Sequence, residues 1–173
     1  DYRRNNVPPP SSFNVTEALC EDLIVFCNGT PEGEPVCTDG YVDTFNPGCD
    51  VVPKGAFLDL GTLGPGSSVW YCGKAGSWYG NPADPNTFTG DSDWYKFVLS
   101  AATPACLTFQ NEMPCDTELL KHTGNCNLTT SIASVSFGAC DIPIDVLLSS
   151  NLAVGNYWFR VGLLPGFTSL CDW

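Results

Sequence analysis

Residues 90–99 read Gly-Asp-Ser-Asp-Trp-Tyr-Lys-Phe-Val-Leu, and this stretch decides the fold class. Its second half, from Trp94 to Leu99, is rich in the aromatic and β-branched residues that favour strands. The run from Tyr157 to Leu163 has the same character. Shorter apolar runs separated by Gly, Pro, Asn and Asp predict further strands at 57–60, 69–72, 106–110, 119–122, 132–137 and 146–148. Their spacing predicts an all-β sandwich.

Residues 14–27 allow two interpretations. Asn14 followed by Glu17 resembles a helix-capping box, and Leu19, Leu23 and Phe26 lie near helical spacing, which predicts a short helix. The run from residue 23 to residue 26 fits a buried strand equally well.

Composition excludes several classes of function. The chain has 173 residues, of which 7 are Lys or Arg and 19 are Asp or Glu, for a net charge of −12. Binding to nucleic acid or to an anionic membrane surface requires a basic patch, so neither is expected. The hydrophobic fraction of 43% is enough for a folded core, and no apolar run reaches the roughly 18 residues that span a bilayer. Membrane insertion is therefore not expected.

Cysteines indicate an oxidising compartment. No two of the ten are closer than seven residues apart, and His122 is the single histidine, so the spacing does not fit a zinc site. We therefore expect disulfides and an extracellular protein, already processed because no signal peptide is visible. Pairing within short loops would join Cys37 to Cys49, Cys115 to Cys126 and Cys20 to Cys27. The full disulfide set is Cys20, Cys27, Cys37, Cys49, Cys72, Cys106, Cys115, Cys126, Cys140 and Cys171.

The N-terminus differs from the rest of the chain. Residues 1–12 hold Arg3 and Arg4 against Asp1, a net charge of +1, whereas the other 161 residues hold 5 basic and 18 acidic groups, a net charge of −13. Three consecutive prolines favour an extended arm over residues 1–15. The arm residues expected to contact a neighbouring subunit are Arg3, Arg4, Pro8, Pro9, Pro10, Phe13 and Val15, and the glycosylation candidates are Asn14, Asn28, Asn127, Ser11 and Ser12.

The stretch 90–99 resembles the Asp-x-Asp-Trp-Tyr-x-Phe strand of bacterial pre-peptidase C-terminal (PPC) domains. Three other stretches are similar to motifs of that family: residues 32–35 (Glu-Gly-Glu-Pro), residues 152–161, and residues 115–126 with their Asp-Thr-x-Leu hairpin. The resemblance covers residues 32–171. It implies a secreted, disulfide-rich, jelly-roll-like β-sandwich at 32–173, preceded by the extended arm at 1–15 and a connecting segment at 16–31.

The resemblance also makes calcium a candidate ligand, although no cofactor is required. Family members that bind calcium place Asn-Asp soon after the Glu-x-Glu-Pro motif, whereas Val36 and Cys37 follow it here. In the other interpretation, Asp91 and Asp93 only start a strand and cap a turn. The oxygen ligands that the resemblance suggests are Glu32, Glu34, Asp43, Asn46, Asp91 and Asp93.

Catalysis is not expected. The chain has one histidine, no Gly-x-Ser-x-Gly motif and cysteines expected to be oxidised, so the usual nucleophile–base pairs lack components. Exposed aromatic side chains instead suggest binding. The loop that holds Trp78 and Tyr79, together with Trp173, forms the candidate contact patch.

The function we expect is that of a structural subunit in an extracellular assembly, such as a glycosylated fibre. Family members usually end with another strand, whereas this sequence ends at Trp173, so an open sheet edge is expected. The arm of a neighbouring copy would complete that edge. The alternative function is a PPC-like accessory module of a secreted hydrolase, which would bind carbohydrate or protein.

Overall fold

The computed structural model describes residues 29–35, 38–73, 77–84, 86, 88–111, 114–138 and 141–164. The arm at 1–15 and residues 16–28 lie outside these ranges. No described helix is long and apolar enough to cross a membrane. The elements are β1 (Thr30–Pro31), β2 (Leu58–Leu63), β3 (Tyr71–Cys72), β4 (Ser77–Tyr79), β5 (Phe88–Gly90), β6 (Ser92–Leu99), β7 (Thr103–Asn111), β8 (Cys115–His122), the 3-10 turn η3 (Cys126–Leu128), β9 (Thr129–Phe137), β10 (Asp141–Leu152) and β11 (Gly155–Leu163).

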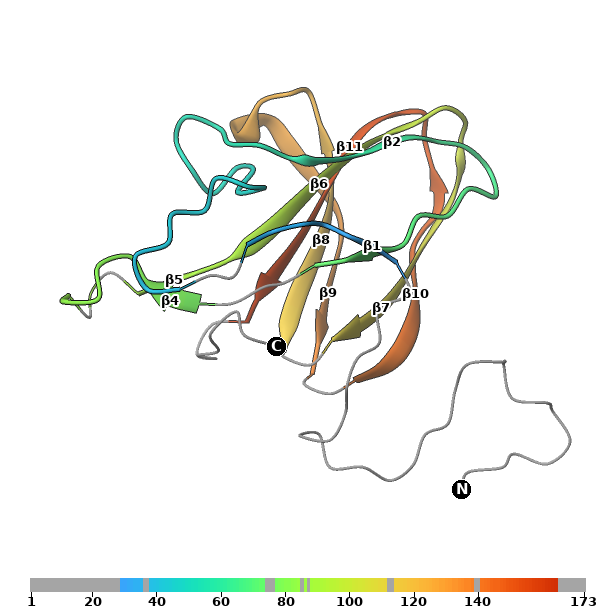
Figure 1. Ribbon diagram of the computed structural model, residues 1–173. Helices are drawn as coiled ribbons and strands as arrows, with labels where there is room; N and C mark the ends of the chain where they lie inside the picture. Colours follow the sequence, from blue (N-terminus) through green and yellow to red (C-terminus); the bar gives the residue numbers. More distant parts are fainter. Residues whose placement is uncertain are drawn as a thin grey trace, which may run out of the picture.

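The main sheet has five strands in the order β2-β6-β11-β8-β9. Its first pair, β2 and β6, is parallel, and the other three pairs are antiparallel. The two strands richest in aromatic residues, β6 and β11, lie beside each other within this sheet (Figure 1). Both have strand neighbours on each side, which explains why their sequences are the most strongly strand-like.

One face of the main sheet carries the apolar core. Strand alternation directs Leu99, Leu119 and Tyr157 to this face, where they form a buried cluster with Leu152 of β10. The antiparallel pair β10–β7 covers this cluster as a second layer. Two layers of strands around one apolar core confirm the expected all-β, sandwich-like fold.

A second small sheet covers another part of the same face. It pairs β1 with β3 in parallel, and Tyr71 of β3 lies against Tyr95 of β6 with ring centroids 6.2 Å apart. Within the described residues, this sheet and β10–β7 share no ladder hydrogen bonds. The layer that covers the core is therefore divided into two separate pairs of strands.

Loops cover part of the opposite face of the main sheet. Trp94, Leu120 and Trp158 form a second cluster there, and the ring of Phe57 stacks on Trp158 with centroids 4.7 Å apart. His122 stacks on the same indole at 3.9 Å. Both sides of the main sheet thus contribute to stability.

A disulfide between Cys49 and Cys126 ties the loop before β2 to η3 and packs against this second cluster. The expected pairings of Cys37 with Cys49 and of Cys115 with Cys126 are therefore wrong. Short loop length favoured them, but the fold brings together two cysteines that are 77 residues apart. Cys72 is also disulfide-bonded, as expected. Cys106 was expected to form a disulfide as well, but it is an exposed thiol with no disulfide partner among the described residues.

The hairpin of β4 and β5 extends from one side of the molecule, away from the layers of the sandwich (Figure 1). The sequence did not predict these strands, nor the two-residue β1, because each is too short to show alternation. All eight predicted strands are present, and most are longer than expected.

Gly48 allows the chain to pass directly beneath Trp94. It is buried with φ +46°, and a Cβ at this position would lie 2.2 Å from Cγ of the indole. Gly66 has a similar φ of +75° but no atom within 4 Å of the added Cβ, so it provides a matched control.

We expect Gly48→Ala to lower the free energy of unfolding by about 3 kcal/mol or more, because backbone strain adds to overpacking. Gly66→Ala should cost only about 1 kcal/mol, from strain alone. Urea unfolding of the two variants measures both values. If both variants lose the same free energy of unfolding, the structure around Trp94 makes room for the added methyl group at no energetic cost.

Candidate metal centre

Six polar side chains from three parts of the chain meet at the start of β6. Two groups of three carboxylates each bring their oxygen atoms within 4.8 Å of one another. Glu34 belongs to both groups, and Asn46 bridges two of the other carboxylates. The six residues are the calcium ligands suggested by the resemblance: Glu32, Glu34, Asp93, Asp43, Asp91 and Asn46. We call them the acidic cluster.

Strand geometry explains why these residues converge. Asp93 and Tyr95 alternate with Trp94 along β6, so both point to the core face. The β1–β3 pairing places Glu32, directly after β1, beside that face. Gly73, directly after β3, passes close to the cluster, because an added Cβ would lie 3.2 Å or less from oxygen atoms of Glu32 and Asp93.

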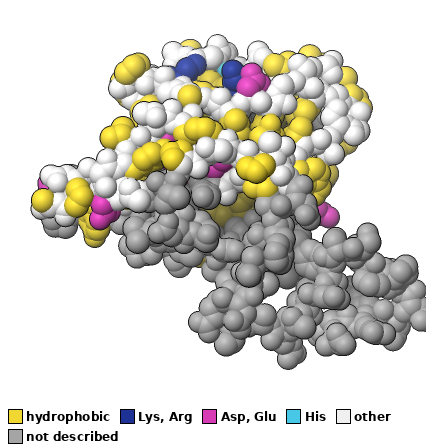
Figure 2. Space-filling view, viewed as in Figure 1, with side chains coloured by type: hydrophobic (Ala, Val, Ile, Leu, Met, Phe, Trp, Pro, Cys, Tyr) yellow, Lys and Arg dark blue, Asp and Glu magenta, His cyan; other side chains and the backbone are white. Residues whose placement is uncertain are grey.

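The acidic cluster is buried. Glu32, Glu34, Asp91 and Asp93 are between 2% and 8% exposed, and Asn46 is fully buried. Figure 2 shows Asp and Glu only as scattered spots on the displayed face, although the chain carries 19 such residues. Four acidic side chains therefore lie together inside the fold, where repulsion between carboxylates is strong.

Hydrogen bonds satisfy part of the cluster. The side-chain amide of Asn46 donates to Asp93 Oδ1 at 2.9 Å and to Glu32 Oε2 at 3.4 Å. Two tyrosine hydroxyls also donate, Tyr95 to Glu32 Oε2 at 3.1 Å and Tyr41 to Glu34 Oε1 at 3.3 Å. These neutral donors hold the carboxylates in place without adding positive charge.

Other oxygens of the cluster are buried without a partner. Neither carboxylate oxygen of Asp91 makes a hydrogen bond of good geometry, and the same holds for Glu34 Oε2 and Asn46 Oδ1. Each buried polar atom left in this state costs about 1–3 kcal/mol, and more if it is charged. Four such atoms in one place point to a cation that they would bind.

The charges raise one another's pKa values. Burial, followed by the charges of Asp91, Glu32 and Asp43, raises the pKa of Glu34 to about 9. Burial and the charges of Asp43 and Glu32 raise the pKa of Asp91 to about 7. The pKa of Asp93 is also raised well above its usual range, mainly by burial. Without a cation, the cluster therefore retains protons at neutral pH.

The donor set selects the type of cation. All its side-chain ligands are oxygens, which suit the hard cations Ca²⁺ and Mg²⁺ rather than metals that prefer nitrogen or sulfur. The ion pairs that the structure describes lie elsewhere, because Lys96 pairs with Asp59 and Arg160 pairs on the other face of the sheet. A metal ion would add positive charge beside the carboxylates of Glu34, Asp43 and Asp91.

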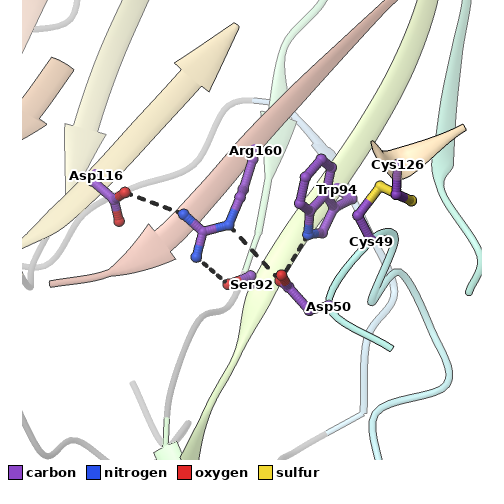
Figure 3. Close-up of polar contacts among 7 residues, drawn as sticks. All are labelled: Cys49, Asp50, Ser92, Trp94, Asp116, Cys126 and Arg160. Atoms are coloured by element: carbon purple, nitrogen blue, oxygen red, sulfur yellow. Dashed lines mark hydrogen bonds and ion pairs between the residues drawn. A yellow bond between two sulfur atoms is a disulfide. The ribbon is translucent and has the colours of Figure 1, made fainter. Parts of the chain in front are cut away.

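A separate polar network surrounds Arg160 (Figure 3). Its guanidinium donates to Asp116 at 3.1 Å and to Ser92 at 2.9 Å, and it lies 3.8 Å from Asp50. The indole of Trp94 donates to Asp50 at 2.8 Å. Because acceptors here face a cation or a donor, this network is satisfied and acts as a structural link between the strands and the disulfide-bonded loop.

The expected contact patch is only partly exposed. Trp78 is 3% exposed, so the expectation that it forms an exposed loop contact is wrong, whereas Tyr79 beside it is 37% exposed. Trp78 lies on a strand and its indole donates to the carbonyl of Tyr41 at 2.7 Å. The sequence reasoning did not single out Trp70, which is 59% exposed just before β3.

Among the glycosylation candidates, Asn127 is exposed on η3. The other predicted site residues outside the described ranges are Arg3, Arg4, Pro8, Pro9, Pro10, Ser11, Ser12, Phe13, Asn14, Val15, Cys20, Cys27, Asn28, Cys37, Cys140, Cys171 and Trp173.

Comparisons with family models, with curated proteins and with solved structures yield no match. The resemblance to PPC domains therefore stays a prediction from sequence motifs. The geometry of the acidic cluster is the main structural indication of function.

The raised pKa values predict how pH affects the metal-stripped protein. Glu34 and Asp91 titrate at about 9 and about 7 in the folded state but near 4 when unfolded. The folded state therefore binds more protons above about pH 4, so the free energy of unfolding falls as pH rises through this window. We expect a lower thermal midpoint at pH 8 than at pH 5.

Asp91→Asn should weaken this pH dependence, because it removes one buried charge, whereas the exposed-site control Asp59→Asn should retain it. Thermal unfolding in a metal-free buffer series measures all three proteins. A thermal midpoint that is constant or rises between pH 5 and pH 8 would contradict the raised pKa values of Glu34 and Asp91.

Proposed function

We propose that this chain is a calcium-stabilised β-sandwich that serves as a structural subunit of an extracellular assembly. The calcium site rests on Asp91, whose two carboxylate oxygens are buried, make no hydrogen bond of good geometry and lie close to the Glu34 and Asp43 carboxylates. A buried carboxylate in that state is costly unless a cation binds it.

Charge supports two ions rather than one. The cluster holds five carboxylates, and its two groups of three share Glu34. One Ca²⁺ would leave a net charge of about −3 in a buried site, and two would leave about −1. A carboxylate that belongs to both groups is suited to bridge two ions. Calcium fits better than magnesium because it accepts six to eight oxygens in irregular geometry.

Metal binding of this kind stabilises the fold instead of catalysing a reaction. Five of the six side chains are buried and only Asp43 is partly exposed, so a substrate has little access to ions held there. Binding would join the segment after β1, the segment 43–46 and the start of β6, which are far apart in sequence. Because these ligands meet only in the folded state, bound calcium adds directly to stability.

Calcium titration by isothermal calorimetry of the metal-stripped protein tests this site. We expect a stoichiometry near two and a rise in the thermal midpoint that is larger at pH 8 than at pH 5, because protons compete with the metal. Glu34→Gln, which alters the shared ligand, should weaken binding by about 100-fold.

The matched control is Asp59→Asn, because Asp59 is an exposed carboxylate paired with Lys96 and lies outside the cluster. It should bind calcium as the unaltered chain does. Absence of calcium binding by the correctly folded, unaltered protein would refute the proposed metal site.

Two features support the assembly function. The layer over the core is made of two pairs of strands, so each of its strands has one edge that no described strand covers. Unpaired edges accept an additional strand. The first twelve residues carry a charge of +1 and the remainder −13, so the arm of one copy is attracted to the body of another. Strand addition between copies would produce a head-to-tail filament.

Trp70 favours a second candidate, the accessory binding module. Trp70 is 59% exposed and Val69 beside it is 42% exposed. Exposed aromatic rings bind sugar faces or partner proteins. This module would be monomeric and would bind a polysaccharide matrix through Trp70.

Deletion of residues 1–12 distinguishes the two candidates. We expect the full chain to form filaments in electron micrographs and the shortened chain to remain as single particles at the same concentration. Assemblies of unchanged length after deletion would refute arm exchange. Monomers of both chains that bind polysaccharide, with binding weakened by Trp70→Ala, would favour the module.

A further inference from the structure

We propose that Tyr41 couples calcium binding to the position of the β4–β5 hairpin, so that metal in the acidic cluster orders this projecting part of the molecule. The inference rests on the proposed calcium site and adds a conformational consequence to it. Three links carry it. Trp78 of the hairpin donates a hydrogen bond to the carbonyl of Tyr41, the hydroxyl of Tyr41 donates to Glu34, and Asp43 follows Tyr41 by two residues in the chain.

The hairpin is held by the segment just after residue 37. The backbone N–H of Gly40 donates to the carbonyl of Tyr79 at 2.7 Å, and the N–H of Tyr79 donates to Asp39 Oδ1 at 3.0 Å. Trp78 adds a third hydrogen bond from its indole to the carbonyl of Tyr41. The position of this segment therefore sets the position of the hairpin.

The apolar contact of the hairpin goes to the same residue. Trp78 is buried against the ring of Tyr41 in an edge-to-face arrangement with centroids 5.1 Å apart. These two rings form a cluster separate from both clusters of the sandwich. A cluster of two rings contributes little stability alone, so docking of the hairpin depends on where Tyr41 is held.

The acidic cluster holds Tyr41 at its other end. Its hydroxyl donates to Glu34 Oε1, and Asp43, two residues later, is one of the proposed ligands. Without metal, no ion pair that the structure describes draws the carboxyl groups of Glu34, Asp43 and Asp91 together. With metal, the three carboxylates are drawn together, which fixes Tyr41 beneath Trp78.

A surface pocket lies where the hairpin meets this segment. It has a volume of about 230 Å³, and its walls include Tyr41, Asp43, Pro47, Trp78 and Gly90. The hairpin and the segment after residue 40 both line it, so loss of hairpin docking would remove one wall. Calcium would thus also maintain the shape of this surface.

Tyr41→Phe tests the coupling because it removes only the hydroxyl bonded to Glu34 and retains the ring that contacts Trp78. Tyr95→Phe is a matched control: it deletes a hydroxyl bonded to Glu32 in the same cluster but has no described hydrogen bond to the hairpin. Calcium affinity of each full-length protein is measured first by calorimetry, and hydrogen exchange is then followed with and without saturating calcium.

In the unaltered chain, we expect calcium to slow exchange of the Gly40 and Tyr79 amides at least tenfold. The same slowing is expected in Tyr95→Phe, and less than threefold slowing in Tyr41→Phe at saturating calcium. Equal slowing in all three proteins would overturn the role of Tyr41. Calcium binding with no change at these amides would overturn the coupling but not the metal site, whereas no calcium binding at all would refute the proposed function itself.

Discussion

Repulsion among five carboxylates, four of them buried and Asp43 partly buried, is the constraint on which the rest of this fold depends. The segments that carry them make few apolar contacts with one another, since the two principal apolar clusters lie along the five-stranded sheet and the third consists of Trp78 and Tyr41. Neutral donors such as Asn46 and Tyr95 position the carboxylates without cancelling their charge. A divalent cation converts this repulsion into a link between distant parts of the chain.

Strand alternation in β6 separates this charged site from a second stabilising system. Asp93 points toward the carboxylates, whereas its neighbours Ser92 and Trp94 point to the face where Arg160 and the Cys49–Cys126 disulfide lie. One eight-residue strand therefore carries a proposed metal ligand on one side and takes part in a satisfied ion-pair network on the other. The Cys49–Cys126 disulfide and a bound metal ion would stabilise opposite faces of the same sheet. Loss of one would therefore leave the other intact.

The sequence was informative where a local pattern determines the structure. The runs in β6 and β11 predict strands because central strands select aromatic and β-branched residues, and the family resemblance named six polar residues that the structure brings close together. Disulfide pairing was not predictable, because loop length says little about which distant segments meet in a fold. The burial of Trp78 was missed for a similar reason: it depends on Tyr41, 37 residues earlier, which no local pattern connects to it.

The acidic cluster also bears on how copies of the chain would join. Glu32 directly follows β1, so the carboxylates fix the strand from which any preceding segment leaves the fold. An arm that reaches a neighbouring molecule can transmit force or select a direction only if its point of attachment is rigid. The parallel pairing of β1 with β3 is just two residues long, which is too little to supply this rigidity alone. Calcium bound beside β1 would supply the rest, and a filament of such subunits would then depend on the metal even though the metal lies within each subunit.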